Sequence, residues 1–201
     1  MCGRFSLGLD DTQLAVQFGI QVPFDLAPRY NIAPSQEIVI VRSDKPDEAS
    51  KAVWGLVPAW GTETSNRIIN ARAETVAEKR MFKSLFEDRR CYIPVDSFYE
   101  WKDKVPYRVM MRDEKGFALA GIWDGTSCAI ITMPSFGSVR RLHGRMPVVL
   151  ERPREYLTGS VAGARDMLAP LPMDFRIYRV SDAINDTRND SGDSVKGVGV
   201  G

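Results

Sequence analysis

Position 2 of the chain holds the residue with the most distinctive chemistry. If Met1 is removed, Cys2 carries an α-amine and a thiol on adjacent carbons, and both groups are partly nucleophilic at neutral pH. Such a 1,2-aminothiol condenses with an aldehyde, because the amine forms an imine and the thiol then closes a five-membered thiazolidine ring. The alternative is that Cys2 is simply a small residue after the initiator methionine.

Two further residues are candidates for proton transfer. Glu100 lies in a predicted strand between Tyr99 and Trp101, whose rings could exclude water and raise the carboxyl pKa towards neutrality. Strand alternation also allows the opposite arrangement, with Glu100 in solvent and both rings inside. His143 is the only histidine and precedes the segment Gly144 to Pro147; a lone histidine can also be an ordinary polar residue.

An amide and a guanidinium precede a predicted helix. Asn70 and Arg72 follow an apolar strand end, and such groups near a helix N-terminus suit an anionic ligand such as phosphate. Alternatively, Asn70 caps the helix and Arg72 pairs with Glu74 or Glu78.

Tryptophans offer a second means of binding nucleic acid. Trp54, Trp60 and Trp101 could stack on unpaired bases. Tryptophans at strand positions are, however, more often core residues.

The composition excludes several classes of protein. The 201 residues, 44% of them hydrophobic, predict one domain over residues 1–201. The net charge of +1 gives no sign of a nucleic-acid partner and excludes none, because a neutral total can contain a local basic groove. The three cysteines, Cys2, Cys91 and Cys128, form no CxxC motif, so we expect a reducing compartment and no disulfide framework. No metal-ligand cluster or phosphate-binding glycine motif is present, so no metal or other cofactor is expected.

The same reading gives an expected location. No apolar run reaches the roughly 18 residues of a membrane helix, and the first residues lack the pattern of a signal peptide. We expect a cytoplasmic protein that does not bind membranes.

The predicted fold class is α+β: a curved mixed or antiparallel sheet, open and barrel-like, with short peripheral helices. A capped helix is expected from Asp10 to about Gly19, followed by a proline-rich loop over 21–36. A charged turn is expected over 43–49 and an amphipathic helix over 73–88. The expected strands cover 38–41, 52–57, 91–93, 96–101, 106–112, 117–123, 127–133, 145–150 and 175–180, and short helices cover 153–157 and 164–168.

Six blocks of sequence resemble the SOS-response-associated peptidase (SRAP) family, the abasic-site shield proteins. They stand in the family's order over most of the chain, with a fainter echo at 180–185. The blocks are Met1 to Phe5, Arg29 to Pro34, Trp54 to Pro58, Ile69 to Thr75, Phe98 to Trp101 and His143 to Pro147. The chain departs from many members at Gly61, where they carry an aromatic residue after the position of Trp60.

The resemblance implies a function and a set of roles. Family members recognise abasic sites in single-stranded DNA and form a covalent crosslink through the mature N-terminal cysteine, here Cys2. It implies a monomer without cofactors that acts on DNA at the nucleoid and the replication fork. The implied catalytic residues are Cys2, Asn70, Glu100 and His143, and the implied DNA-binding residues are Arg4, Pro34, Trp60, Arg72, Thr132 and Arg145.

Three other activities stay open at this point. A thiol peptidase would use Cys2 as nucleophile and His143 as base, and could act only on its own Met1. A plain single-strand-binding module would use aromatic residues and arginines without a covalent step. Strand cleavage by a lyase reaction is a side branch of the imine, which thiazolidine closure would suppress.

Overall fold

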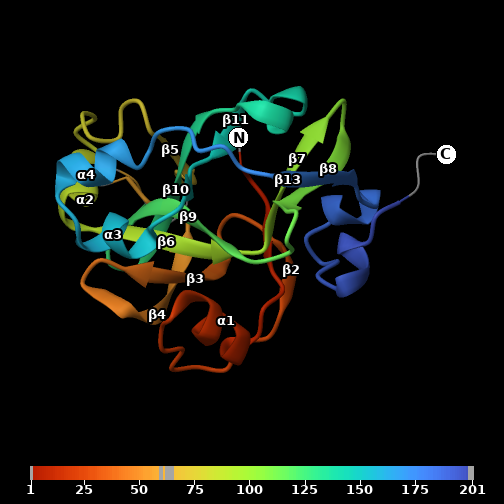
Figure 1. Ribbon diagram of the computed structural model, residues 1–201, viewed down its shortest axis with the longest axis horizontal. Helices are drawn as coiled ribbons and strands as arrows, with labels where there is room; N and C mark the ends of the chain where they lie inside the picture. The colour runs from red at the N-terminus through yellow and green to blue at the C-terminus, as the bar shows by residue number, and fades with distance from the viewer. Residues whose placement is uncertain (1, 59–60, 62–65, 199–201) are drawn as a thin grey trace.

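The computed structural model of the chain describes residues 2–58, 61 and 66–198, and its strands form two sheets (Figure 1). The five-stranded sheet has the order β13-β8-β7-β1-β2, and its strands are β1 (Phe5–Leu7), β2 (Arg29–Ile32), β7 (Ser97–Lys102), β8 (Val105–Met111) and β13 (Phe175–Arg179). The eight-stranded sheet contains β3 (Glu37–Arg42), β4 (Lys45–Trp54), β5 (Asn70–Arg72), β6 (Arg90–Val95), β9 (Phe117–Trp123), β10 (Ser127–Pro134), β11 (Arg145–Pro147) and β12 (Val149–Leu150).

Short helices surround the two sheets. In Figure 1, α2, α3 and α4 lie on one side and the C-terminal turns lie beside β8 on the other. The helices are α1 (Asp11–Phe18), α2 (Lys83–Asp88), α3 (Pro153–Thr158) and α4 (Val161–Asp166), with 3-10 turns η1 (Gly137–Arg141), η2 (Asp182–Asn185) and η3 (Gly192–Val195). The predicted α+β class with a curved mixed sheet and short peripheral helices is confirmed. Among the described residues, none of the helices has the length and apolar character needed to cross a bilayer.

The larger sheet closes into a ring. β10 pairs with β4 in parallel and with β9 in antiparallel fashion, while β3 and β6 complete the path between them. Gly121 stands opposite both Cys91 and Ile130, and an added Cβ there would lie 2.6 Å from a methyl group of Ile93. The ring therefore leaves little room for a side chain at this position, since the carbonyl oxygen of Ala129 would lie 3.0 Å from the same Cβ.

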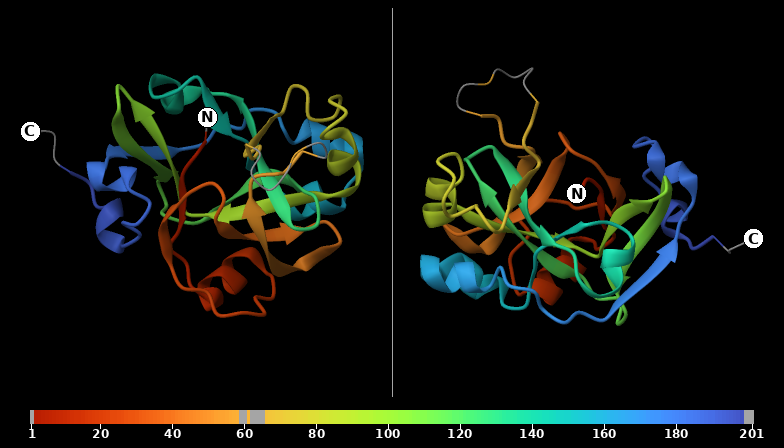
Figure 2. Two further views of the ribbon diagram at one scale, coloured as in Figure 1. Left: turned by 180° about the vertical axis from the view of Figure 1, so that it is seen from behind. Right: turned by 90° about the horizontal axis from the view of Figure 1, so that it is seen from above.

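The N-terminal segment runs between the two sheets, as both views in Figure 2 show. β1 pairs with β7 through Phe5 opposite Phe98, and the amide of Tyr99 donates to the carbonyl of Arg4 over 2.9 Å. The ring of Phe5 packs 5.1 Å from that of Trp54 in the other sheet. Apolar packing thus fixes the path of residues 2–5 between the sheets.

The first helix begins and ends as predicted. The Asp10 side chain accepts a hydrogen bond from the backbone amide of Gln13, and the side-chain oxygen of Gln13 accepts one from the backbone amide of Asp10. Gly19 closes the helix in the left-handed conformation, at φ 64°.

The predicted helix over 73–88 is wrong over its first ten residues. β5 continues to pair beyond Arg72, because the amide of Ala73 donates to the carbonyl of Thr132. A sequence of turns follows, and only α2 is helical. Val76 and Phe82 are still buried, so the apolar pattern marked burial correctly but not the backbone conformation.

Several strand limits also differ from the predictions. The proline-rich loop contains β2, since Arg29–Ile32 pairs with β1. The charged turn is reduced to Ser43 and Asp44, because β4 extends from Lys45 and includes the second predicted strand only as far as Trp54. The expected strand over 145–150 is two strands, β11 and β12, which pair with different neighbours.

The C-terminal segment is held against β2 by two polar side chains. The Asn31 amide donates to the carbonyls of Ile184, Asp186 and Asn189 over 2.9–3.2 Å. Asp190 accepts from the backbone amides of residues 30 and 31 and forms an ion pair with Arg29.

The structure therefore predicts a large effect of removing the buried Asn31 side chain. Asn31→Ala leaves several buried polar groups without partners, so we expect unfolding to become easier by about 2–4 kcal/mol. Urea denaturation would measure the change. Asn66→Ala, at an exposed asparagine, is the control; equal effects of the two variants would contradict the role given to Asn31.

Candidate functional site

Cys2 is fully buried between the two sheets. Its carbonyl oxygen accepts a hydrogen bond of 2.9 Å from the side-chain amide of Asn70 on β5. Burial raises the pKa of the Cys2 thiol well above its ordinary value, and the nearby Glu100 carboxylate raises it further. The thiol at this site is therefore protonated at neutral pH.

Glu100 lies inside the protein, with 2% of its surface exposed. The alternation of β7 turns Tyr99 and Trp101 the other way, into a small cluster with Val180 and Ile184. Both faces of β7 are thus covered. The alternative that places Glu100 in solvent is therefore wrong. Burial raises the pKa of Glu100 to about 7, as the desolvation argument from the sequence expected.

His143 follows η1 and faces Glu100. Its Nδ1 lies 3.9 Å from Oε2 of Glu100 and accepts a hydrogen bond of 3.0 Å from the backbone amide of Arg145. About a third of the His143 side chain is exposed. The imidazole therefore lies between solvent and the buried carboxyl.

Among the buried side-chain atoms that lack a hydrogen-bond partner in the described residues, two acceptors lie beside Cys2. They are Oδ1 of Asn70 and Oε1 of Glu100. Buried polar atoms are nearly always paired in folded proteins, so each exception asks for an explanation. Both atoms belong to side chains beside Cys2, which points to a polar group that binds there.

Asn70 reaches Cys2 from a strand and not from a helix N-terminus. β5 runs parallel to β10, and Asn70 stands opposite Ile130 in that pairing. The predicted helix terminus at this place is absent, because α2 begins only at Lys83. The proposed capping role of Asn70 is therefore wrong.

Arg145 forms a bidentate ion pair with Glu74. The two guanidinium nitrogens lie 2.7 and 2.9 Å from the carboxylate oxygens, and one of them also donates to the Thr132 carbonyl over 2.6 Å. Hydrogen bonds from Arg145 lower the pKa of Glu74 to about 2. Thr132 is fully buried on β10, so this pair joins β5, β10 and β11 at the edge of the site.

The other predicted DNA-binding residues lie in different settings. Arg72 is exposed on β5. Arg4 is half-buried, and its Nη1 donates to Oδ1 of Asn31 and to the Ile184 carbonyl. Pro34 is half-buried after β2, and Trp60 lies outside the described residues.

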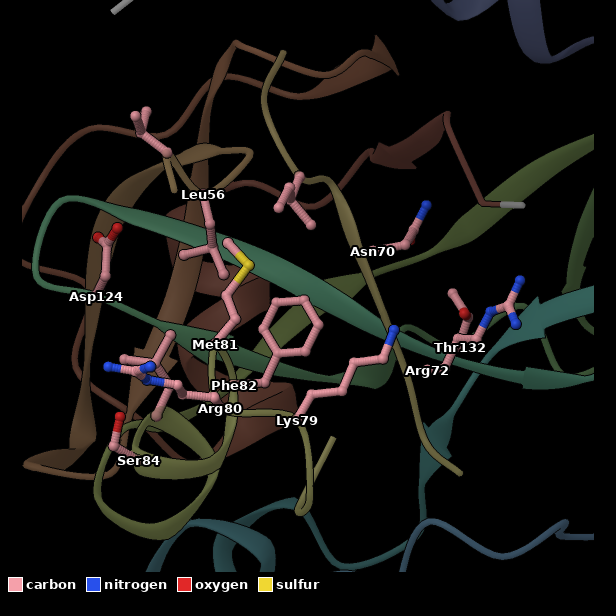
Figure 3. A pocket seen from close by; sticks show the side chains of 13 residues that line it. Leu56, Asn70, Arg72, Lys79, Arg80, Met81, Phe82, Ser84, Asp124 and Thr132 are labelled. Carbon is pink, nitrogen blue, oxygen red and sulfur yellow. The ribbon is translucent and has the colours of Figure 1, made fainter. Parts of the chain in front are cut away.

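A cleft of about 1190 Å³ opens beside Asn70 and Thr132 (Figure 3). Leu56, Met81 and Phe82 contribute to its apolar wall. The chain also lines it with the basic side chains Arg72, Lys79 and Arg80.

The sequence patterns did not identify this cleft or the Arg145–Glu74 pair. Met81 and Phe82 fall within the predicted amphipathic helix over 73–88, and the sequence offers Glu74 only as a partner of Arg72. The adjacent cations Lys79 and Arg80 next to Met81 were the available signal.

Within the described residues, no group of three or more His, Cys, Asp or Glu side chains could hold a metal ion. The site instead combines a thiol, a carboxyl that titrates near neutrality and an amide. Such a set can move protons during addition to a carbonyl carbon.

The raised pKa of Glu100 predicts a pH effect on stability. In the unfolded chain this pKa is about 4.3, so the folded state holds the proton more tightly. The resulting stabilisation is complete below about pH 4.3 and is lost as pH rises through about 7. Glu100→Gln should therefore gain stability relative to the wild type between about pH 5 and pH 8, by up to about 3 kcal/mol in urea denaturation.

Glu74→Gln is the matched control. In the wild type, the lowered pKa of Glu74 contributes stability that is present above about pH 4.3 and is lost only as pH falls through about 2. Its difference from the wild type should thus stay constant from about pH 5 to pH 8. If the difference in stability between Glu100→Gln and the wild type also stayed constant over this range, Glu100 would not be the group that titrates there.

Comparison with known proteins gives matches along nearly the whole chain. A family model described as "SOS response associated peptidase (SRAP)" matches residues 1–187. The chain is 35% identical to "Abasic site processing protein YoaM" of Bacillus subtilis, over 95% of this chain and 96% of that protein. It is 28% identical to "Abasic site processing protein YedK" of Escherichia coli, over 98% of this chain and 100% of that protein.

Solved structures give the same relationship. A crystal structure of a protein from Bacteroides thetaiotaomicron superposes with a TM-score of 0.86 at 25% identity, covering 98% of this chain and all of the other. The resemblance drawn from the six sequence blocks is confirmed: the chain belongs to the SOS response associated peptidase (SRAP) family.

Proposed function

We propose that the protein processes abasic sites in single-stranded DNA by capturing them covalently on Cys2. The observation that carries the proposal is the buried group of Cys2, Asn70 and Glu100, in which a carboxyl with a pKa of about 7 lies near the thiol. The names of the relatives, abasic site processing proteins, support the same class of substrate.

The proposed reaction begins after removal of Met1. The free α-amine of Cys2 attacks C1′ of the open-chain deoxyribose aldehyde and forms a carbinolamine. Protonation of its hydroxyl releases one water and leaves an imine. The thiol sulfur then bonds to the same carbon, the thiol proton is transferred to the ring nitrogen, and the thiazolidine adduct contains one water less than the reactants.

Glu100 is the proposed proton carrier. A carboxyl that is half protonated near pH 7 can donate to the departing hydroxyl and then accept the thiol proton as the sulfur attacks. The 3.9 Å approach of His143 to Glu100 supports a role in returning protons from solvent. Asn70 orients Cys2 through its carbonyl and offers Oδ1 to the sugar.

The DNA strand that carries the lesion would lie along the edge of the site where Arg72 and Arg145 stand. The exposed Arg72 is suited to a phosphate contact. Arg145 and Thr132 would contribute through the edge that they build with Glu74. Direct contacts by Arg4, Pro34 and Trp60, action as a monomer, and a cytoplasmic location at replicating DNA stay predictions.

The environment of Cys2 favours condensation over peptide cleavage. A cysteine peptidase needs a thiolate, and such sites lower the cysteine pKa. Here burial and Glu100 both raise it. Condensation starts instead with the amine, so a protonated thiol is compatible with the first step.

Intact-mass spectrometry tests the proposal directly. The untagged protein is mixed with a single-stranded oligonucleotide that bears one abasic site. We expect the protein without Met1 to gain the mass of the oligonucleotide less one water. Unchanged protein mass would leave non-covalent binding or peptidase activity as the function.

Variants at residue 2 identify the reacting groups. Cys2→Ala should bind the oligonucleotide but form no stable thiazolidine. Cys2→Ser should increase strand cleavage, because an imine that is not trapped by sulfur permits elimination of the 3′ phosphate. Equal cleavage by Cys2→Ser and wild type would argue against the imine.

The phosphate contact is tested by salt dependence. Arg72→Ala should weaken binding to all sequences alike and reduce the slope of log K against log salt by about 0.7. Arg188→Ala is the control, because Arg188 is exposed and pairs with Asp186 away from β5. An unchanged slope for Arg72→Ala would show that this guanidinium does not meet a phosphate.

A further inference from the structure

The turn between β6 and β7 carries a buried carboxylate that contacts the N-terminal strand. Asp96 stands between Val95, the last residue of β6 in the larger sheet, and Ser97, the first residue of β7 in the other sheet. One of its oxygens accepts a hydrogen bond from the hydroxyl of Ser6 on β1, and the other accepts a bond of 2.7 Å from the backbone amide of Gly8. Asp96 therefore joins the end of β1 to the point where the chain passes from one sheet to the other.

Further hydrogen bonds support this contact from β7 and β8. The Ser6 hydroxyl gives its proton to Asp96 and accepts from the hydroxyl of Ser97, which stands directly opposite it on β7. Arg108 on β8 donates through Nε to the Ser97 hydroxyl over 2.7 Å, and its Nη2 lies 3.4 Å from Oδ1 of Asp96. All four residues are buried. The charge of Asp96 is thus both paired and hydrogen-bonded, as a carboxylate in the interior requires.

Backbone pairing alone fixes the register of β1 only weakly. β1 has three residues, and each register offers its backbone the same kind of hydrogen bonds. A slip of two residues along β7 would also keep Phe5 on the apolar face, because side chains alternate with a period of two. Such a slip would move Cys2 by about 7 Å along the strand, away from Glu100. It would also separate the Ser6 hydroxyl from its partners, so the polar network distinguishes the observed register from the slipped ones.

We propose that Asp96 is a positioning residue for the capture reaction at Cys2. It acts through β1 and not on the reacting atoms, by holding the strand in the register that places Cys2 beside Glu100. Ser97 and Glu100 point to opposite faces of β7, so the network supports the site from the other side of the strand. The inference rests on the proposed function, because it concerns the placement of the residue that reacts with the abasic site.

The test separates the rate of capture from binding. Protein without Met1, in excess over a single-stranded oligonucleotide with one abasic site, gives the rate of adduct formation at saturation. A tetrahydrofuran residue, a baseless sugar that cannot react, then replaces the abasic site and gives the dissociation constant. Ser6→Ala removes a donor to Asp96 and should slow capture by at least about tenfold, because small displacements of reacting groups have large effects on rate. Its affinity for the unreactive oligonucleotide should equal that of the wild type.

A second variant disturbs the same carboxylate in a different way. An added Cβ at Gly8 would lie 2.6 Å from Oδ2 of Asp96, so Gly8→Ala displaces the carboxylate without removing its charge. We expect the same slow capture and unchanged affinity as in Ser6→Ala. Ser194→Ala is the matched control, because it removes the hydroxyl of another buried serine, which donates to the Asn189 carbonyl in the C-terminal segment. It should leave the capture rate unchanged.

Hydrogen exchange tests the hold on β1 without any DNA. The amide of Tyr99 donates to the carbonyl of Arg4 over 2.9 Å, and β1 must detach from β7 before its register can change. This amide should exchange about tenfold faster in Ser6→Ala and Gly8→Ala than in the wild type. The amide of Ile122, which is buried in the ring on β9, should exchange as slowly as before.

Three results would overturn the inference. They are wild-type capture rates in Ser6→Ala and Gly8→Ala, a loss of affinity that accounts for the slower capture, and equal slowing in Ser194→Ala. A wild type that forms no adduct would instead refute the proposed function. In that case unchanged exchange of the Tyr99 amide would also refute the role of Asp96 in the register, whereas faster exchange would support it.

Discussion

The pairing of β1 with β7 determines where the reactive residues lie. Phe5 stands opposite Phe98, and continuing this register brings the residues before Phe5 alongside Glu100. Asn70 then fixes the same segment to the second sheet through the carbonyl of Cys2. A shift of β1 by one residue in this register would turn the side chains of the N-terminal segment away from the face of β7 that carries Glu100. The thiol, the carboxyl and the amide therefore meet because three strands from two sheets are held in one arrangement.

Burial explains the protonation states at the site. A carboxylate and a thiolate side by side in the interior would repel each other and lose their hydration. The molecule avoids this cost because both pKa values are raised, so that Cys2 is neutral and Glu100 titrates near pH 7. At the edge of the site the opposite holds, since Arg145 keeps Glu74 charged. The two carboxyl groups thus differ in charge state, since Glu100 titrates near pH 7 whereas Glu74 stays charged in its ion pair.

Local patterns in the sequence predicted the elements that depend on local interactions. The strand over Phe117–Trp123 and the capped first helix needed only neighbouring residues and agree with the structure. The segment after Arg72 does not form the predicted helix, because pairing of Ala73 with Thr132 overrides its helical pattern. The side chains at the site were named through the family resemblance, whereas the partner of Arg145 and the cleft depend on strands that are distant in sequence. Arg90 is a further example: it is buried and donates to the carbonyls of Phe86, Tyr156 and Gly159 at the ends of two helices, a role that no spacing indicates.

The contact of Arg4 with the Ile184 carbonyl spans 180 positions of the chain. Translation adds roughly 5–20 residues per second, so Ile184 follows Arg4 by on the order of ten seconds or more. The segment that carries Cys2 is not fully enclosed during that interval, because the C-terminal turn that carries Ile184 has not yet been synthesised. Its terminus is thus open to processing enzymes on the ribosome, and also to reactive aldehydes of the cell. The order of synthesis therefore gives the nascent chain a period in which Cys2 is not yet buried beside Glu100.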